Sequence, residues 1–255
     1  MLNLLSTFTI LAFLLISGSA MAQEVVVAVD HFPPWKIIDE EKISGIDIEL
    51  VQALLAEVGM TPKLFPCPWS RALSMMKTGQ ADMISGILKR PEREKTMIFI
   101  APPYKTKSRK AFYIRTGTRD IVSYEDLSNL TIGVQHDAIY FDRFDTDQSL
   151  RKAPVHEDKL NFKMLAAGRV DTVIITESIG DYLVADLGLN SRITKATYCH
   201  DKAVPVYFAV SRKSPLAARV KELSEAAQRL SESGVFDRII ADYFTQLKTD
   251  QPPSQ

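Results

Sequence analysis

Apolar residues recur along this chain with two periods, one typical of strands and the other typical of helices. Residues 25–29 are continuously apolar and mostly β-branched, which predicts a strand buried on both faces of a parallel sheet. From Leu50 to Val58 the apolar positions recur at helical spacing instead, which predicts a helix that Asp47 caps and Gly59 ends. A strand followed by an amphipathic helix is the first unit of an α/β chain.

The same two patterns repeat to the end of the chain, in two βα cycles followed by a helical return. Further strands are predicted at residues 63–65, 81–87, 97–100, 111–114, 130–134, 171–175 and 205–210. Further helices are predicted at residues 70–79, 140–144, 158–168, 179–187, 215–233 and 235–244, with Ser70, Asp158 and Ser214 as caps. In open α/β sheets, ligands bind at the carboxyl ends of the strands. We therefore expect a binding site in the loops after Val29, Phe65, Ile87, Val134 and Ile175.

The first 22 residues differ from the rest and predict a secretory signal peptide. Residues 2–16 form a nearly unbroken apolar run, and small residues then lead to Ala20-Met21-Ala22, after which the chain turns polar. The run is shorter than the roughly 20 apolar residues that span a membrane, which favours a signal peptide over a membrane anchor. One feature of a signal peptide is missing, because no Lys or Arg precedes the run. We therefore expect cleavage after Ala22 and export of a soluble protein to the periplasm.

Charge and cysteine content narrow the function further. Lys and Arg total 31 and Asp and Glu total 31, so no net charge directs the chain to nucleic acid or to a membrane surface. The sequence has no spacing typical of a metal site, a phosphate-binding loop or a catalytic nucleophile, so we expect no cofactor, no metal and no catalytic residue. Cys67 and Cys199 either form one disulfide or stay as two thiols, because geometry decides their pairing.

Several short segments, spread over nearly all of the expected mature chain, occur in the order that one protein family shows. They are residues 45–50 (Gly-Ile-Asp-Ile-Glu-Leu), Pro68-Trp69, residues 79–82, 91–93, Pro103-Tyr104, residues 124–127, 133–135, 167–171 and 233–237. In this order the segments resemble the periplasmic solute-binding proteins of family 3, the polar amino-acid type.

The resemblance implies an α/β fold with two lobes, the type II fold of periplasmic binding proteins. Two open, mostly parallel sheets flanked by helices would be joined by a hinge that the chain crosses twice. Residues 23–104 would form the first part of lobe 1, residues 105–205 would form lobe 2, and residues 206–255 would return to lobe 1. The crossings would fall near residues 104–108 and 201–205.

The resemblance also implies ligand contacts in the first lobe. Arg93 would pair with a ligand carboxylate through its bidentate guanidinium, and the alternative is that it is one more solvated charge in a charged run. Phe32 and Trp69 would pack on the ligand. Ser85 and Gly86 would bring a hydroxyl group and the backbone close to it.

Other polar residues near the expected site depart from the family pattern. Asp30 either receives a ligand amine or caps a loop amide, and Arg71 either binds a second anionic group or pairs with an acid such as Asp30. The family's Asp that binds an α-amino group falls at Thr176, whose hydroxyl cannot replace a carboxylate, and Glu177 stands next to it. At Asp137 the chain departs from a Gly-Thr pair that helps to hold the carboxylate. The ligand is then an amino acid, a related acid without an α-amine, or another small polar molecule.

These observations predict a monomeric binding protein rather than a catalyst. It would close on a small, polar, carboxylate-bearing solute and deliver it to an inner-membrane ABC permease. One alternative is a ligand-sensing module for a membrane receptor. The other is an enzyme, because some relatives on this fold are dehydratases of cyclic dienyl acids, and Glu177 could act there as a general acid.

Overall fold

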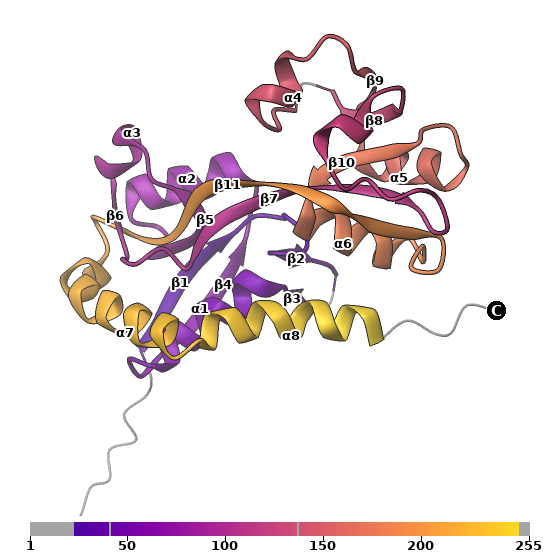
Figure 1. Ribbon diagram of the computed structural model, residues 1–255. Helices are drawn as coiled ribbons and strands as arrows, with labels where there is room; N and C mark the ends of the chain where they lie inside the picture. Colours follow the sequence, from indigo (N-terminus) through magenta and orange to yellow (C-terminus); the bar gives the residue numbers. More distant parts are fainter. Residues whose placement is uncertain (1–22, 41, 137, 250–255) are drawn as a thin grey trace, which may run out of the picture.

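Strands and helices alternate along the chain as the apolar pattern predicts. The computed structural model describes residues 23–40, 42–136 and 138–249 (Figure 1). Its strands are β1 (Gln23–Val29), β2 (Ile37–Ile38), β3 (Ile43–Ser44), β4 (Met60–Pro66), β5 (Met83–Leu88), β6 (Met97–Phe99), β7 (Lys105–Arg115), β8 (Thr131–Gln135), β9 (Arg151–Val155), β10 (Thr172–Thr176) and β11 (Ile193–Ser211). Its helices are α1 (Ile46–Ala56), α2 (Trp69–Thr78), α3 (Pro91–Glu94), α4 (Asp142–Thr146), α5 (Asp158–Ala166), α6 (Glu177–Asp186), α7 (Val220–Glu232) and α8 (Val235–Thr249), with 3₁₀ turns η1 (Tyr124–Leu127) and η2 (Pro215–Arg219).

Most strands belong to one hydrogen-bonded path in the order β4-β1-β5-β11-β7-β10-β8-β9, with β6 on β11. Strands β4, β1 and β5 are parallel to one another, and so are β10, β8 and β9. The long strands β7 and β11 pair antiparallel with each other and join these two parallel groups. The two predicted sheets are therefore two wings of one path, and Figure 1 shows β7 and β11 running across the middle.

Each wing has its own hydrophobic core. We define the first half as β1 to β6 with η2, α7 and α8, and the second half as η1 to α6; β7 and β11 belong to both. In the first half, Leu50 of α1 and Phe236 of α8 lie in one cluster, while Met76 of α2 lies in another on the opposite face. In the second half, the neighbours Phe112 and Tyr113 of β7 belong to different clusters, one with α4 and the other with α5 and α6. Each of these clusters takes its described side chains from one half.

The register places the carboxyl ends of the two wings opposite each other. Leu88, the last residue of β5, pairs with Val206, which also pairs with Lys105 at the start of β7. Thr176, the last residue of β10, pairs with Lys110. β5 and β7 run in the same direction because both are antiparallel to β11, whereas β10 runs against β7. The two strand ends therefore point toward each other across the stretch from Lys105 to Lys110, about 17 Å of extended strand.

The structure confirms most of the predicted strands but lengthens the two that join the halves. β7 begins at Lys105, although the apolar pattern predicts a strand only from residue 111. β11 spans Ile193–Ser211, although only residues 205–210 are predicted. Charged and polar residues fill the added stretches, which are buried on neither face for most of their length, so no apolar alternation marks them. β9 is not predicted for the same reason, since it is an edge strand without a fully buried residue.

Three of the predicted helix caps are wrong, and one is confirmed. Asp47 lies inside α1, Ser70 lies inside α2 and Asp158 is in the first turn of α5, and none of these helices has a side-chain cap. Ser214 does cap η2, because its hydroxyl accepts a hydrogen bond from the amide of Leu216. The predicted caps stand one or two residues after the true N-cap residues, Gly45, Pro68 and Glu157.

Candidate functional site

The loop after β1 holds an ion pair beside an aromatic ring. Asp30 follows the last residue of β1, and its carboxylate accepts a hydrogen bond from the ammonium group of Lys36. Lys36 is only 2% exposed, and its ammonium nitrogen lies 5.6 Å from the centre of the Trp69 ring. Asp30 therefore pairs with a lysine of its own loop and not with Arg71, the partner that the sequence suggested. Arg71 is exposed, and its guanidinium carbon lies 5.5 Å from the centre of the Phe65 ring.

A second carboxyl group is buried next to this lysine. Asp47 is 1% exposed, and one of its oxygens accepts a 2.8 Å hydrogen bond from the hydroxyl of Tyr104. Burial raises the pKa of Asp47, and the charge of Lys36 and the Tyr104 hydroxyl oppose that rise. Gly86 leaves room for both groups, because a Cβ on its backbone, which has a φ of +74°, would lie 3.0 Å from the Asp47 carboxylate and 3.1 Å from the Lys36 ammonium. Ser85 is buried at the preceding position of β5.

Arg93 of the short helix α3 lies near the same aromatic ring. Its guanidinium carbon is 5.6 Å from the centre of the Trp69 ring, and its Nη1 donates a 2.9 Å hydrogen bond to the carbonyl of Leu88. Burial lowers the pKa of Arg93, and no carboxylate of the described residues forms an ion pair with it. Phe32 is 49% exposed, so it presents an apolar ring to solvent. We call Asp30, Lys36, Trp69, Ser85, Gly86 and Arg93 the first-half surface.

In the second half, a lysine of the long strand β7 holds the residue that ends β10. Lys110 donates a 2.7 Å hydrogen bond to the hydroxyl of Thr176, and its ammonium nitrogen lies 5.7 Å from the centre of the Tyr140 ring. Burial lowers the pKa of Lys110, and the nearby charge of Lys202 lowers it further. The position where the family carries an amine-binding Asp therefore holds a hydroxyl that is already bonded to an ammonium group.

Glu177, the first residue of α6, is engaged in ion pairs of its own half. Its Oε1 lies 2.6 Å from Nζ of Lys195 and 3.7 Å from Nη1 of Arg109. The Lys195 ammonium is also 2.9 Å from Oδ2 of Asp181, and Arg109 Nε donates a 2.9 Å hydrogen bond to Asp201. Glu177 therefore belongs to a network of charged side chains instead of replacing the missing Asp next to it.

A cavity of about 600 Å³ lies where the two halves meet, on the side of the long strands where α6 and α8 lie. Its walls include Trp35 and Tyr104 of the first half and Thr176 and Glu177 of the second. Lys105 lies over Trp35, with its ammonium nitrogen 4.0 Å from the ring centre, and burial lowers its pKa to about 8. The junction on this side is therefore not close-packed, in contrast to the cores of the two halves.

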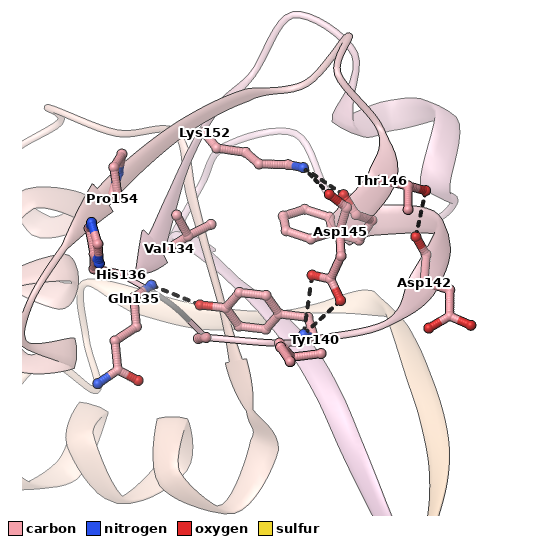
Figure 2. Close-up of a pocket in the computed structure, with 12 residues that line it drawn as sticks. Val134, Gln135, His136, Tyr140, Asp142, Asp145, Thr146, Lys152 and Pro154 are labelled. Carbon is pink, nitrogen blue, oxygen red and sulfur yellow. Dashed lines mark hydrogen bonds between the residues drawn. The ribbon is translucent and has the colours of Figure 1, made fainter.

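A second cavity, of about 610 Å³, lies within the second half alone, and Figure 2 shows its lining. Lys152 donates a 2.6 Å hydrogen bond to the carbonyl of Phe144, and the carboxylate of Asp145 accepts the amide of Tyr140 at 3.1 Å. The Lys152 and Asp145 side chains are thus bonded within the protein. Asp137, the predicted ligand contact in the neighbouring loop, lies outside the described residues.

The two cysteines are both free thiols. Cys67 is buried just after β4 in the first half, and burial raises the pKa of its thiol. Cys199 is partly exposed on β11, where it pairs with Ala111 in the second half. Of the two alternatives that the sequence left open, the structure therefore shows two thiols.

The predicted site residues gather in two groups that face each other. Those of the first-half surface lie at the ends of β1, β4 and β5, whereas Thr176 and Glu177 lie at the end of β10. Lys36 and Lys110 are the candidates that sequence reasoning missed. Lys36 is the one charge between Pro33 and Ile38, and a cation in an apolar loop is a signal of a buried pair. Lys110 lies in a basic run that was not predicted to be a strand. The face of the sheet on which its side chain lies could therefore not be assigned from the sequence.

Comparison with known proteins identifies the family of this chain. A profile of the bacterial extracellular solute-binding proteins, family 3, matches residues 25–246. The chain belongs to this family. Its fold is the type II fold of periplasmic binding domains, as the sequence predicted. The members of this family are binding proteins by name, and the family is extracellular.

Individual relatives agree with this assignment. "Probable amino-acid-binding protein YxeM" of Bacillus subtilis (strain 168) is 20% identical over 217 residues, which cover 84% of this chain and 80% of that protein. Substrate-binding domain 2 of Lactococcus lactis GlnP, solved in an open conformation, has a TM-score of 0.73 at 18% identity, covering 87% of this chain and 95% of the domain. The amino acid ABC transporter substrate-binding protein AbpA of Streptococcus pneumoniae Canada MDR_19A was solved with L-arginine. It has a TM-score of 0.58 at 26% identity, and the match covers 88% of this chain and 95% of AbpA. In the described part of this chain, no helix has the length and apolarity needed to span a membrane.

Proposed function

We propose that this protein binds a small, carboxylate-bearing solute between its two halves and delivers it to an inner-membrane ABC importer. The opposed strand ends carry the proposal, because Arg93 follows the end of β5, Thr176 ends β10, and the short stretch from Lys105 to Lys110 separates them. A guanidinium that no described carboxylate neutralises is suited to bind a ligand carboxylate in bidentate fashion. Trp69 beside it supplies apolar contact area at a low cost in conformational entropy.

Closure of a hinge would complete the site. Lobes formed by residues 23–104 and 206–255, and by residues 105–205, are supported by hydrophobic clusters that each draw on one half. β7 and β11 carry the chain from one half to the other, and a two-strand connection permits rotation of one half against the other. Hinge closure around a ligand is an established motion of periplasmic binding proteins.

The proposal places the protein in the periplasm as a monomer without a cofactor. The extracellular character of the family supports export, while the expected signal peptide, residues 1–22, lies outside the described residues. A binding role is preferred over the dehydratase alternative because Glu177, the general acid of that alternative, lies within ion-pair distance of both Lys195 and Arg109.

Thermal unfolding against a panel of solutes tests the proposed function. The panel contains amino acids, their deaminated acids, dicarboxylic acids, and amines that lack a carboxylate. A ligand present at 100 times its Kd stabilises the folded state by about 2.7 kcal/mol, which is visible as a higher midpoint. We expect such a shift with carboxylate-bearing solutes only, with the solute recovered unchanged by mass spectrometry. A panel without any shift, or consumption of a solute, would contradict the proposal.

A further inference from the structure

The charges at the two strand ends narrow the class of solute. On the first half, the Arg93 guanidinium makes no ion pair with a described residue. On the second half, Lys110 donates to the Thr176 hydroxyl at 2.7 Å and also makes no ion pair with a described residue. Lys110 lies near Tyr140, just before α4, and Figure 1 shows α3 and α4 on the same side of the long strands. The elements that carry or contact the two cations therefore lie on the same side of the long strands, one in each half.

The carboxyl groups near these cations are mostly committed elsewhere. Asp30 and Glu177 are ion-paired with lysines of their own halves. Asp145 accepts a backbone amide at 3.1 Å. Glu92, next to Arg93, and Asp158, in the first turn of α5, are the exceptions. Burial raises the pKa of Asp158, and the charge of Lys110 opposes that rise. Arg93 and Lys110 thus form no ion pair with a described residue, and each can bind a ligand carboxylate.

A ligand amine at Thr176 would meet the ammonium group of Lys110. Two like charges at contact distance repel each other, and partial burial of Lys110 strengthens the repulsion because water screens it less. A carboxylate placed there would instead gain a charge-assisted hydrogen bond from the same ammonium group. The Lys110 ammonium group therefore favours an anion over a cation next to Thr176, and it does so against the charges of Asp145 and Asp158.

We propose that the solute is a dicarboxylate without a free amine, with one carboxylate bound by Arg93 and the other by Lys110. This inference rests on the proposed binding function and adds the substrate class to it. Arg93 follows the end of β5 and Lys110 pairs with the last residue of β10, and these two strand ends face each other across about 17 Å of extended strand. Both side chains are long, and hinge closure would bring the two halves closer together, which suits a short dicarboxylate rather than a larger molecule.

Titration calorimetry with matched pairs of solutes tests the proposal. Glutarate and 2-oxoglutarate carry two carboxylates without an amine, glutamate adds an amine to the same chain, and glutamine removes one carboxylate. We expect the first two to bind at least about tenfold more tightly than glutamate or glutamine, the size that like-charge repulsion and a lost charge pair produce. This ranking uses the unmodified protein, so it does not depend on the folding of any variant.

Variants of the second half locate the effect. Lys110→Gln is expected to weaken glutarate binding at least about tenfold, while Lys110→Arg retains most of it. Lys107→Gln, an exposed lysine of the same strand, is the matched control and should leave the Kd within about twofold. Thr176→Asp places a carboxylate beside Lys110 and should weaken glutarate while it improves glutamate. Thermal midpoints of all variants exclude unfolding as the cause.

Each outcome decides between the proposed function and the substrate class. If glutamate or glutamine binds more tightly than glutarate, and Asp158→Asn abolishes that binding, Asp158 holds a ligand amine; the dicarboxylate proposal is then wrong while the binding function stands. If Lys110→Gln leaves glutarate affinity unchanged, the second anion contact is wrong. If no carboxylate-bearing solute binds at all, both the substrate class and the function are wrong.

Discussion

The two halves build their sides of the proposed site in different ways. In the first half, Lys36, Asp47 and Ser85 are buried and lie against one another between the β1 loop, α1 and β5. In the second half, Lys110 and Thr176 are only partly buried, and one hydrogen bond holds them together. The first-half surface is thus fixed by the folding of its core, whereas the second-half contacts can be exchanged without disturbing a core.

This difference indicates that the two halves bind different parts of the ligand. Trp69 and Arg93, which lie beside this buried cluster, can hold a ligand carboxylate on the first half. Partly exposed side chains on the facing half can then select the remainder of the ligand. The departure at Thr176 falls in the second half, whereas Arg71, which also departs from the family pattern, lies in the first.

Removal of Arg93 has the largest expected effect. Arg93→Ala should weaken binding of the solute that shifts the thermal midpoint most by about 2–5 kcal/mol, because the ligand carboxylate loses its partner in a partly desolvated site. The free energy of unfolding should change by less than about 1 kcal/mol, since Arg93 lies on a surface helix and makes one hydrogen bond with the backbone. Titration calorimetry and urea unfolding measure the two quantities.

Arg90→Ala is the matched control for this prediction. Arg90 precedes α3, is exposed, and should affect neither affinity nor stability by more than about 0.5 kcal/mol. Equal affinity of the Arg93→Ala variant and the unmodified protein would show that Arg93 is one more solvated charge, which is the alternative reading of the charged run around it.

The sequence was a better guide to the first half than to the second, for physical reasons. Arg93 and Trp69 were named as candidates because they lie in short segments that resemble the family pattern. Lys36 and Asp47 could not, because their pairing depends on how the β1 loop folds against α1, and neither residue type predicts burial by itself. Lys110 was missed because an alternating pattern signals a strand only where one face is apolar, and the crossing stretch has no apolar face.

Loss of the Tyr104 hydroxyl tests whether the first-half surface depends on its buried polar cluster. Tyr104→Phe removes the 2.8 Å hydrogen bond to Asp47 and leaves a buried carboxyl oxygen without its partner. The free energy of unfolding should fall by about 1–3 kcal/mol, the cost of a buried polar group left unsatisfied. Urea unfolding at neutral pH measures it. Tyr182→Phe, which removes a 3.4 Å contact with Asp186 at the surface of the second half, should cost less than about 0.5 kcal/mol. Equal losses in the two variants would mean that the halves do not differ in this respect.

Lys105 belongs to neither half alone, because it begins the strand that leaves the first half and is affected by acids of both. Burial lowers its pKa to about 8, and the charges of Asp47 and Glu177 oppose this effect. The unfolded chain keeps a lysine pKa near 10.4. Between about pH 8 and 10.4 the unfolded state therefore binds more protons than the folded state, and the contribution of Lys105 to stability rises with pH. Below pH 8 the ammonium is charged in both states, so the full cost of burying it is present.

Lys105→Met should therefore stabilise the protein at pH 7, and the gain should shrink as the pH rises above about 8. The gain should be about 1 kcal/mol, since the lost contact between the ammonium and the Trp35 ring offsets part of the relieved burial cost. Urea unfolding of both proteins from pH 6.5 to 9.5 measures the difference in their free energies of unfolding. Other titrating groups contribute equally to both proteins, so their effect cancels in this difference. When Glu177→Gln is also present, the pH above which this gain begins to shrink should be lower, because the carboxylate that favours the charged form of Lys105 is gone. A difference that does not depend on pH would show that Lys105 is as well solvated as a surface lysine, and that the junction between the halves is open to water on this side.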